Sequence, residues 1–131
     1  MIPRRRKYGN KTISNTIGDF DSKGEYQRYL FLLDAQRAGK ISNLRRQVEY
    51  ELLPTQYKTK IVHLKTKDKE VTMVAERSVS YVADFVYEKD GEIVAEDFKG
   101  FPDDKYPIKR KMMLFFHGIS VREIKRPTEE I

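Results

Sequence analysis

A helical pattern of apolar residues opens the folded part of the chain. Within residues 19–40, Ser22 and Glu25 match the S-x-x-E capping box that starts many helices. Gly39 is placed to end the helix as a left-handed cap. Large side chains recur between these signals at 3.6-residue spacing, so we expect them to form a stripe that faces the core. The stripe consists of Tyr26, Tyr29, Leu30, Leu33 and Arg37.

Alternation replaces the helical period after residue 43. Even positions from 44 to 52 are apolar except Arg46, and the odd positions are polar, which predicts a half-buried strand that Pro54 ends. Residues 60–74 then form a strand–turn–strand pattern with a charged tip at residues 66–70. We expect this segment, about residues 57–76, to be an extra β-hairpin that leaves the main sheet.

Two further strands are predicted within residues 80–100, because Asp90-Gly91 is a strong signal for a two-residue hairpin turn. Counting outward from the turn pairs Lys89 with Glu92 and Asp84 with Asp97. The opposite face can be core, with Glu96 as its one charged member. Its apolar members are Tyr81, Ala83, Phe85, Tyr87, Val94 and Phe98.

The last elements are a helix and a short strand. Pro107 suits a first helical turn and Gly118 a cap, which predicts a helix within residues 104–118. Its expected apolar stripe is Ile108, Met112 and Phe115, with Met113 and Phe116 beside it. Residues 119–125 predict a strand, and residues 127–131 a tail that frays. The element order is helix, three strands, helix, strand, so we expect one α/β domain over residues 19–126 with a mixed central sheet and flanking helices.

Charge is distributed unevenly along the chain. The net charge is +6, and residues 1–11 hold five basic side chains and no acid. The basic N-terminal arm, residues 1–18, therefore carries most of the excess. Two interpretations stay open: a phosphate-binding arm that uses Arg4, Arg5 and Arg6, or a solubilising terminus.

Composition excludes several classes of protein. The 131 residues suit one domain, and the chain has no cysteine, which rules out disulfides and thiolate metal sites. No apolar run approaches the roughly 20 residues of a membrane span, and the first residues lack the apolar stretch of a signal peptide. We therefore expect a cytoplasmic protein with no membrane contact. His63 and His117 stand alone, without a zinc pattern.

The facing acids Asp84 and Asp97 call for an explanation, because like charges opposite each other destabilise a sheet. Carboxylates at that spacing can share a hard divalent cation such as Mg²⁺, whose remaining waters can attack a phosphodiester. Lys99 lies on the same face as Asp97 and could orient that water. The alternative is a pair of surface acids in which Lys99 merely neutralises Asp97. Two roles are also open for Glu25: it completes the capping box, or it adds a third acid to the metal shell.

The element order and three segments resemble the PD-(D/E)XK nuclease superfamily over about residues 20–124. The segments are FDSKGEYQRY, YVADF and EDFKG, with HGISVREI closing the domain. The likeness is closest to small phage-encoded members of unknown function, which are similar in layout to phage Holliday-junction resolvases and to the nuclease subunit of some transposases. The resemblance implies a restriction-endonuclease-like αβββαβ core.

The resemblance also implies roles for particular residues. Asp84, Asp97 and the backbone carbonyl of Phe98 would hold Mg²⁺ or Mn²⁺, Glu25 would be the helix-borne acid, and Lys99 the catalytic lysine. Gln47 would correspond to a glutamine in the first core strand of some relatives, where it could contact DNA. The proline that precedes the first acid in the family motif is Ala83 here.

Basic residues outside the acid pair suggest where DNA would lie. Lys109 and Arg110 begin the second predicted helix, where free N–H groups attract phosphate, whereas Lys111 fits a solvated face. The resulting expectation is a divalent-metal-dependent endodeoxyribonuclease, selective for branched DNA and homodimeric because a resolvase cuts two strands symmetrically. The alternatives are an inactive DNA-binding accessory protein and a general nicking or end-processing nuclease within a phage complex.

Overall fold

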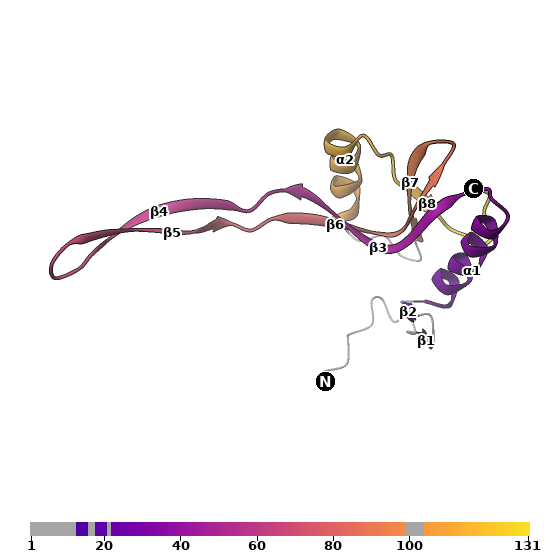
Figure 1. Cartoon of the computed structure of the whole chain (residues 1–131), viewed down its shortest axis with the longest axis horizontal. Helices are drawn as coiled ribbons and strands as arrows, with labels where there is room; N and C mark the ends of the chain where they lie inside the picture. Colours follow the sequence, from indigo (N-terminus) through magenta and orange to yellow (C-terminus); the bar gives the residue numbers. More distant parts are fainter. Residues whose placement is uncertain (1–12, 16–17, 21, 99–103) are drawn as a thin grey trace.

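The computed structural model describes residues 13–15, 18–20, 22–98 and 104–131. Two helices, α1 (Lys23–Arg37) and α2 (Tyr106–His117), accompany eight strands in this part of the chain (Figure 1). The strands are β1 (Ile13–Asn15), β2 (Gly18–Phe20), β3 (Ser42–Leu53), β4 (Gln56–His63), β5 (Asp68–Glu76), β6 (Val79–Lys89), β7 (Glu92–Phe98) and β8 (Arg122–Ile124).

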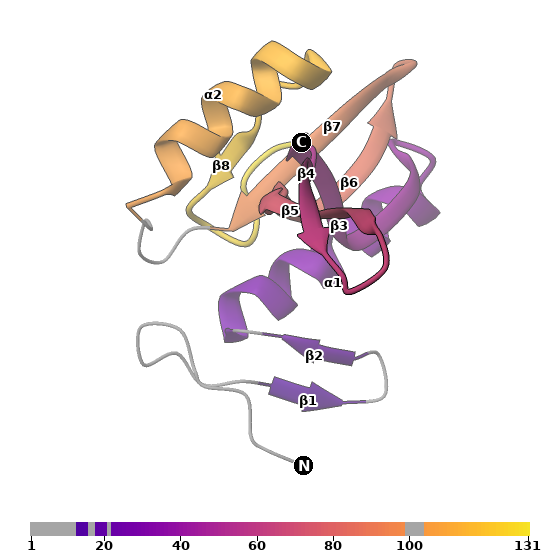
Figure 2. The ribbon, with the colours of Figure 1, turned by 90° about the vertical axis from the view of Figure 1, so that its left-hand side faces the viewer.

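The central sheet has four strands in the order β3-β6-β7-β8. Its first three strands are antiparallel to their neighbours, and β8 joins β7 in parallel. The helices α1 and α2 lie on different sides of these strands (Figure 2). The predicted α/β class with a mixed sheet and flanking helices is thus confirmed. A second small sheet pairs β1 with β2, in the segment expected to be a basic arm.

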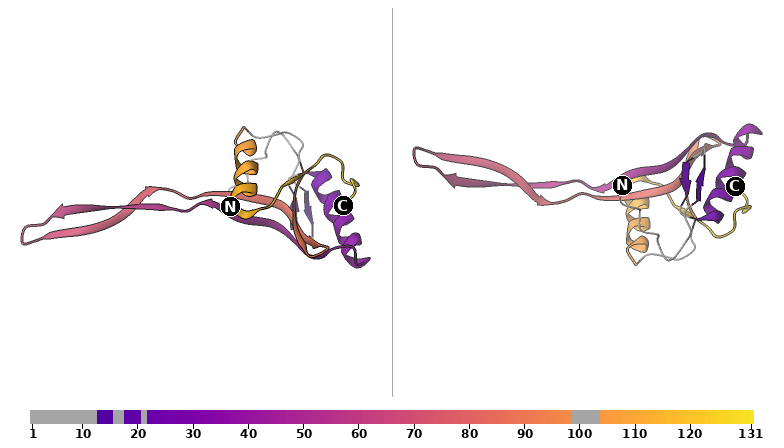
Figure 3. Two further views of the ribbon diagram at one scale, coloured as in Figure 1. Left: turned by 90° about the horizontal axis from the view of Figure 1, so that it is seen from above. Right: turned by 90° about the horizontal axis from the view of Figure 1, so that it is seen from below.

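The predicted extra hairpin is present as a two-stranded ribbon of β4 and β5. It prolongs the β3–β6 pair and projects away from the helices and the rest of the sheet (Figures 1 and 3). Its tip closes with a hydrogen bond from Leu64 N–H to the Lys67 carbonyl at 2.9 Å, slightly before the predicted position. This hairpin could be predicted from the sequence because alternation and a charged turn are local signals.

The predicted register of the β6–β7 hairpin is confirmed from the turn to the residue pair next to Asp84 and Asp97. Lys89 pairs with Glu92 and Phe85 with Glu96, which is one step before the two acids. Asp90 (φ 52°) and Gly91 (φ 80°) both have positive φ, as a type I′ turn requires.

At Asp84, the buried side chains of β6 switch from one helix to the other. On β6, Tyr81 and Ala83 belong to the core under α2, whereas Phe85 and Tyr87 belong to the core under α1. Side chains two residues apart normally share a face, so the prediction of one core face for all four residues is wrong: the alternation of β6 breaks at Asp84, where the strand pair twists. Gln47, opposite Asp84 in β3, has a φ of 51° at this same step.

Two predicted apolar stripes are only partly right, because Tyr29 in α1 and Met112 and Met113 in α2 pack in the core as expected, whereas other members do not. In α1 the buried face is Glu25, Arg28, Leu32 and Ala35, and Leu30 is 38% exposed. In α2 the buried residues are Tyr106 and Met113, whereas Ile108 is 61% and Phe115 82% exposed. In α1, hydrophobicity misplaced the buried face because Glu25 and Arg28, polar residues that the periodicity does not weigh, take part in it.

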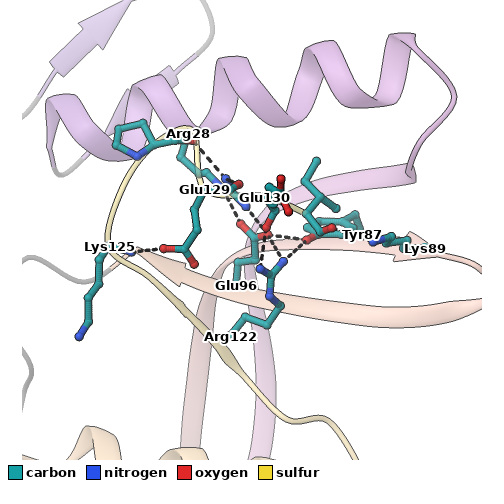
Figure 4. A network of polar contacts seen from close by, with 10 residues as sticks. Arg28, Tyr87, Lys89, Glu96, Arg122, Lys125, Glu129 and Glu130 are labelled. Atoms are coloured by element: carbon teal, nitrogen blue, oxygen red, sulfur yellow. Dashed lines mark hydrogen bonds and ion pairs between the residues drawn. The ribbon is translucent and has the colours of Figure 1, made fainter.

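Glu96 explains why Arg28 of α1 is buried. Arg28 donates from Nε to Glu96 Oε1 at 2.8 Å and from Nη2 to Oε2 at 2.7 Å, with both side chains fully buried. The hydroxyl of Tyr87 also donates to Glu96, and Arg122 lies 3.4 Å from the same carboxylate (Figure 4). A buried charge needs such partners.

The C-terminal segment packs against this network instead of fraying as expected. Arg28 donates to the main-chain carbonyls of Pro127 and Glu129, and Arg122 donates to that of Glu130 at 2.7 Å (Figure 4). Lys89 donates to a terminal oxygen of Ile131, also at 2.7 Å. The prediction failed because these partners come from distant elements that no local pattern reveals.

Candidate functional site

Asp84 and Asp97 lie side by side at the point where β6 twists. Asp84 Oδ2 accepts a hydrogen bond from the main-chain N–H of Phe98 at 2.8 Å, which ties the end of β7 to β6. Asp97 is 4% exposed. Burial raises the pKa of Asp84 well above its usual value, and the charge and hydrogen bonding of Asp97 raise it further. The two carboxyl groups therefore share one side of the sheet, as the predicted register required.

Gln47 and Glu25 complete the group around Asp84. The Gln47 side-chain amide donates to Glu25 Oε1 and to Asp84 Oδ1, both at 3.3 Å. Glu25 is 4% exposed, and its charge contributes to the raised pKa of Asp84. Ser22 caps α1 by accepting from the Glu25 N–H at 3.1 Å, so this half of the predicted capping box is confirmed while the Glu25 carboxylate lies at the site.

Gly24 explains how the start of α1 approaches the site. A Cβ at this position would lie 2.6 Å from the ring of Phe98, so only glycine permits this close contact. The contact sets the first turn of α1 against the end of β7, next to Asp97. Sequence inspection gave Gly24 no role, because a single glycine in a first helical turn carries no signal by itself.

A second polar layer surrounds Asp97. Burial raises the pKa of the Tyr81 hydroxyl, as does the neighbouring Asp97 carboxylate. The pKa of Tyr106 is also raised, by burial first and then by the charges of Glu123 and Asp97. Asp97 pairs with Glu123 across the parallel β7–β8 step. Tyr81 and Tyr106 were not expected at the site, since aromatic residues at those positions are typical of a core.

Lys109 and Arg110, the two predicted DNA contacts on α2, lie at its start, and their role in DNA binding stays a prediction. Arg110 donates to Glu123 at 2.8 Å, and this bond lowers the pKa of Glu123. Lys109 is half-buried. Arg4, Arg5, Arg6 and Lys99 lie outside the described residues, so their predicted roles stay predictions.

The described residues contain no group of three or more acidic, histidine or cysteine side chains that could hold a metal ion. The nearest candidate for a cation is the Asp84–Asp97 pair, with Glu25 joined to Asp84 through the Gln47 amide. Two adjacent carboxylates fit Mg²⁺, which commonly binds one or two carboxylates and keeps several waters. His63 contacts Asp68 on the ribbon, and His117 donates to the Glu51 carbonyl, both away from this site.

Comparison with known proteins places the chain in a family without assigning an activity. No helix in the described part of the chain combines the length and apolar character needed to cross a membrane. Searches of curated proteins and of solved structures found no match. A family described as "Protein of unknown function (DUF1064)" matches residues 5–126, and the chain belongs to this family.

Proposed function

We propose that this protein is a divalent-metal-dependent DNA endonuclease of the PD-(D/E)XK type that acts on branched DNA. The observation that carries the proposal is the pairing of Asp84 with Asp97, with Gln47 joining Asp84 to Glu25. Acids from two neighbouring strands lie together where β6 twists, and an acid of α1 joins them through the Gln47 amide. This is the arrangement that the resemblance to the superfamily implied.

The roles of the residues follow from their positions. Asp84, Asp97 and the Phe98 carbonyl would hold Mg²⁺ or Mn²⁺, with Glu25 as an outer acid. The bound ion would supply a Lewis acid and an acidified water for hydrolysis of the phosphodiester. Gln47 fixes the orientation of Asp84 and Glu25 through its amide. Lys99 would orient the attacking water or steady the developing negative charge.

The order of elements supports the proposed restriction-endonuclease-like core. Apart from the β1–β2 sheet and the β4–β5 ribbon, the chain runs α1, β3, β6, β7, α2, β8. This order matches the αβββαβ layout of the resembled superfamily. Symmetric cutting of a junction would require a homodimer acting inside the host cell, with Arg4, Arg5, Arg6, Lys109 and Arg110 near the DNA.

A labelled four-way junction and a matched linear duplex, each with Mg²⁺ and with chelator, test the proposal. We expect metal-dependent cutting of the junction and little cutting of the duplex. Asp97→Asn and Lys99→Ala should bind the junction and fail to cut it. Equal cutting of both substrates indicates a general nuclease. Full activity of either variant contradicts the site assignment.

One observation favours a second candidate, an inactive DNA-binding accessory protein. The described residues hold two adjacent carboxylates but no three-ligand metal group. Isothermal titration of the protein with Mn²⁺ separates the candidates, because the nuclease should bind the ion through Asp84 and Asp97. Junction binding with neither Mn²⁺ binding nor cutting would support the accessory role.

A further inference from the structure

The β4–β5 ribbon has two chemically different faces. Its register is continuous from Tyr57↔Val74 to His63↔Asp68. Successive side chains on a strand point to opposite faces, so the pairs alternate between the two sides. One side, called the lysine face, carries Lys58, Lys60, Val62, Lys69, Val71 and Met73.

Within the continuous ladder, from Tyr57↔Val74 to His63↔Asp68, charge is segregated between these faces. The lysine face holds three exposed lysines and no acid. The acids of the continuous ladder, Asp68 and Glu70, both lie on the other face, where Asp68 contacts His63 at 2.8 Å. The lysine face therefore presents a one-sign surface along an otherwise mixed ribbon.

The ribbon also has the shape of a binding arm. It projects beyond the sheet without a covering layer in the views of Figures 1 and 3. Met73 is 41% exposed beside the lysines. An isolated two-stranded hairpin is marginally stable in water, so a partner on the lysine face would stabilise the ribbon as well as neutralise its charge.

We propose that the lysine face of the β4–β5 ribbon binds duplex DNA, with the ribbon in the major groove and Lys58, Lys60 and Lys69 on the phosphates. The major groove of B-DNA is about 12 Å wide and admits a two-stranded β-ribbon. The A-form RNA groove is too narrow for it. A second copy that docks through the same face is a poor occupant, because two lysine faces would repel each other. The inference deepens the proposed function by naming where a duplex arm of the substrate lies.

Binding without cleavage tests the inference. Fluorescence anisotropy of a labelled duplex, in chelator and over a range of salt, compares the wild type with Lys58→Gln/Lys60→Gln/Lys69→Gln. Each lost phosphate contact lowers the salt slope by roughly 0.9, so we expect a slope smaller by about 2 to 3 and at least tenfold weaker binding at low salt. Lys40→Gln/Lys111→Gln/Lys125→Gln removes the same charge from exposed positions elsewhere and should change affinity about twofold or less.

Several outcomes would overturn the inference. The first is an unchanged salt slope of DNA binding in the ribbon variant. The second is a loss of DNA affinity in the control variant equal to that in the ribbon variant. The third is a wild-type dimer that becomes monomeric in the ribbon variant while DNA binding persists. The last outcome, read by light scattering, would assign the ribbon to a second copy. Circular dichroism confirms that each variant is folded. Ribbon-dependent binding without any cutting would leave this inference standing and remove the proposed function, whereas cutting with no ribbon dependence would do the reverse.

Discussion

Arg28 of α1 and Glu96 of β7 form a bidentate ion pair in which both side chains are completely buried. The pair commits Glu96 to the face of the sheet under α1. Its neighbour Asp97 therefore points to the other side, next to Asp84. In the sequence, Glu96 and Asp97 are adjacent acids at the start of the EDFKG segment. The ion pair gives Glu96 a structural role and leaves Asp97 for the site.

Removing one partner of the pair should destabilise the fold strongly. Glu96→Ala leaves the Arg28 guanidinium buried without a counter-charge, which typically costs about 3–5 kcal/mol. We expect this loss in the free energy of unfolding measured by urea denaturation. The double variant Arg28→Met/Glu96→Leu removes both charges and should recover a large part of the loss. A change below about 1 kcal/mol in Glu96→Ala would contradict the buried geometry.

The C-terminal segment should contribute to stability through Arg28 and Lys89. Deleting residues 127–131 removes the carbonyl acceptors of Arg28 and Arg122 and the terminal oxygen that Lys89 contacts. Hydrogen bonds to charged groups contribute about 1.5–3 kcal/mol each, and water can replace some of them. We expect a loss of at least about 2 kcal/mol in urea denaturation. Thr128→Ala keeps every one of these main-chain acceptors and should be neutral, whereas an equally stable deletion would mean that the segment is only loosely held.

The sequence predicted the sheet better than the helix faces, for a physical reason. Alternation, the Asp90-Gly91 turn and the register that faces Asp84 with Asp97 depend on a few neighbouring residues. The buried face of α1 depends on Glu96, which is distant in the sequence and gives Arg28 a place in the core. Pattern and family resemblance likewise predicted that Asp84, Asp97 and Glu25 belong to the candidate site, whereas Gly24 and Tyr81, whose place depends on distant residues, were missed.

Relieving the acid pair should stabilise the metal-free protein. Like charges opposite each other on a sheet cost roughly 0.2–1 kcal/mol, and Asp84→Asn removes one of them. Because the folded pKa of Asp84 is raised, the folded protein binds this proton more tightly than the unfolded chain. Stability of the wild type therefore falls as pH rises from the usual aspartate range through the raised pKa.

Thermal melts in chelator at pH 5 and pH 8 measure this effect. We expect Asp84→Asn to be more stable than the wild type at pH 8, with a smaller difference at pH 5. Adding Mn²⁺ should raise the melting temperature of the wild type, because a ligand that binds only the folded state stabilises it. The variant should lose most of that increase. A variant that is less stable than the wild type in chelator at pH 8 would show that the two carboxylates do not repel each other.

The backbone of Gln47, whose side chain joins Glu25 to Asp84, should be strained. Its φ of 51° lies in the left-handed region, which costs a non-glycine residue roughly 1–2 kcal/mol. Both Gln47→Gly and Gln47→Ala remove the amide that joins Glu25 to Asp84, but only glycine relieves the backbone. We therefore expect Gln47→Gly to be more stable than Gln47→Ala by about 1 kcal/mol in urea denaturation, with the same reduced rate of junction cutting in both.

A neighbouring position in β3 gives the matched control. Glu49 is exposed and is not among the non-glycine residues with positive φ in the described part of the chain. Glycine weakens an ordinary strand relative to alanine, because it loses more conformational freedom on folding. Glu49→Gly should accordingly be less stable than Glu49→Ala, the opposite order to position 47. If alanine is the better residue at both positions, Gln47 is not strained, and the twist that brings Asp84 to Glu25 must come from packing alone.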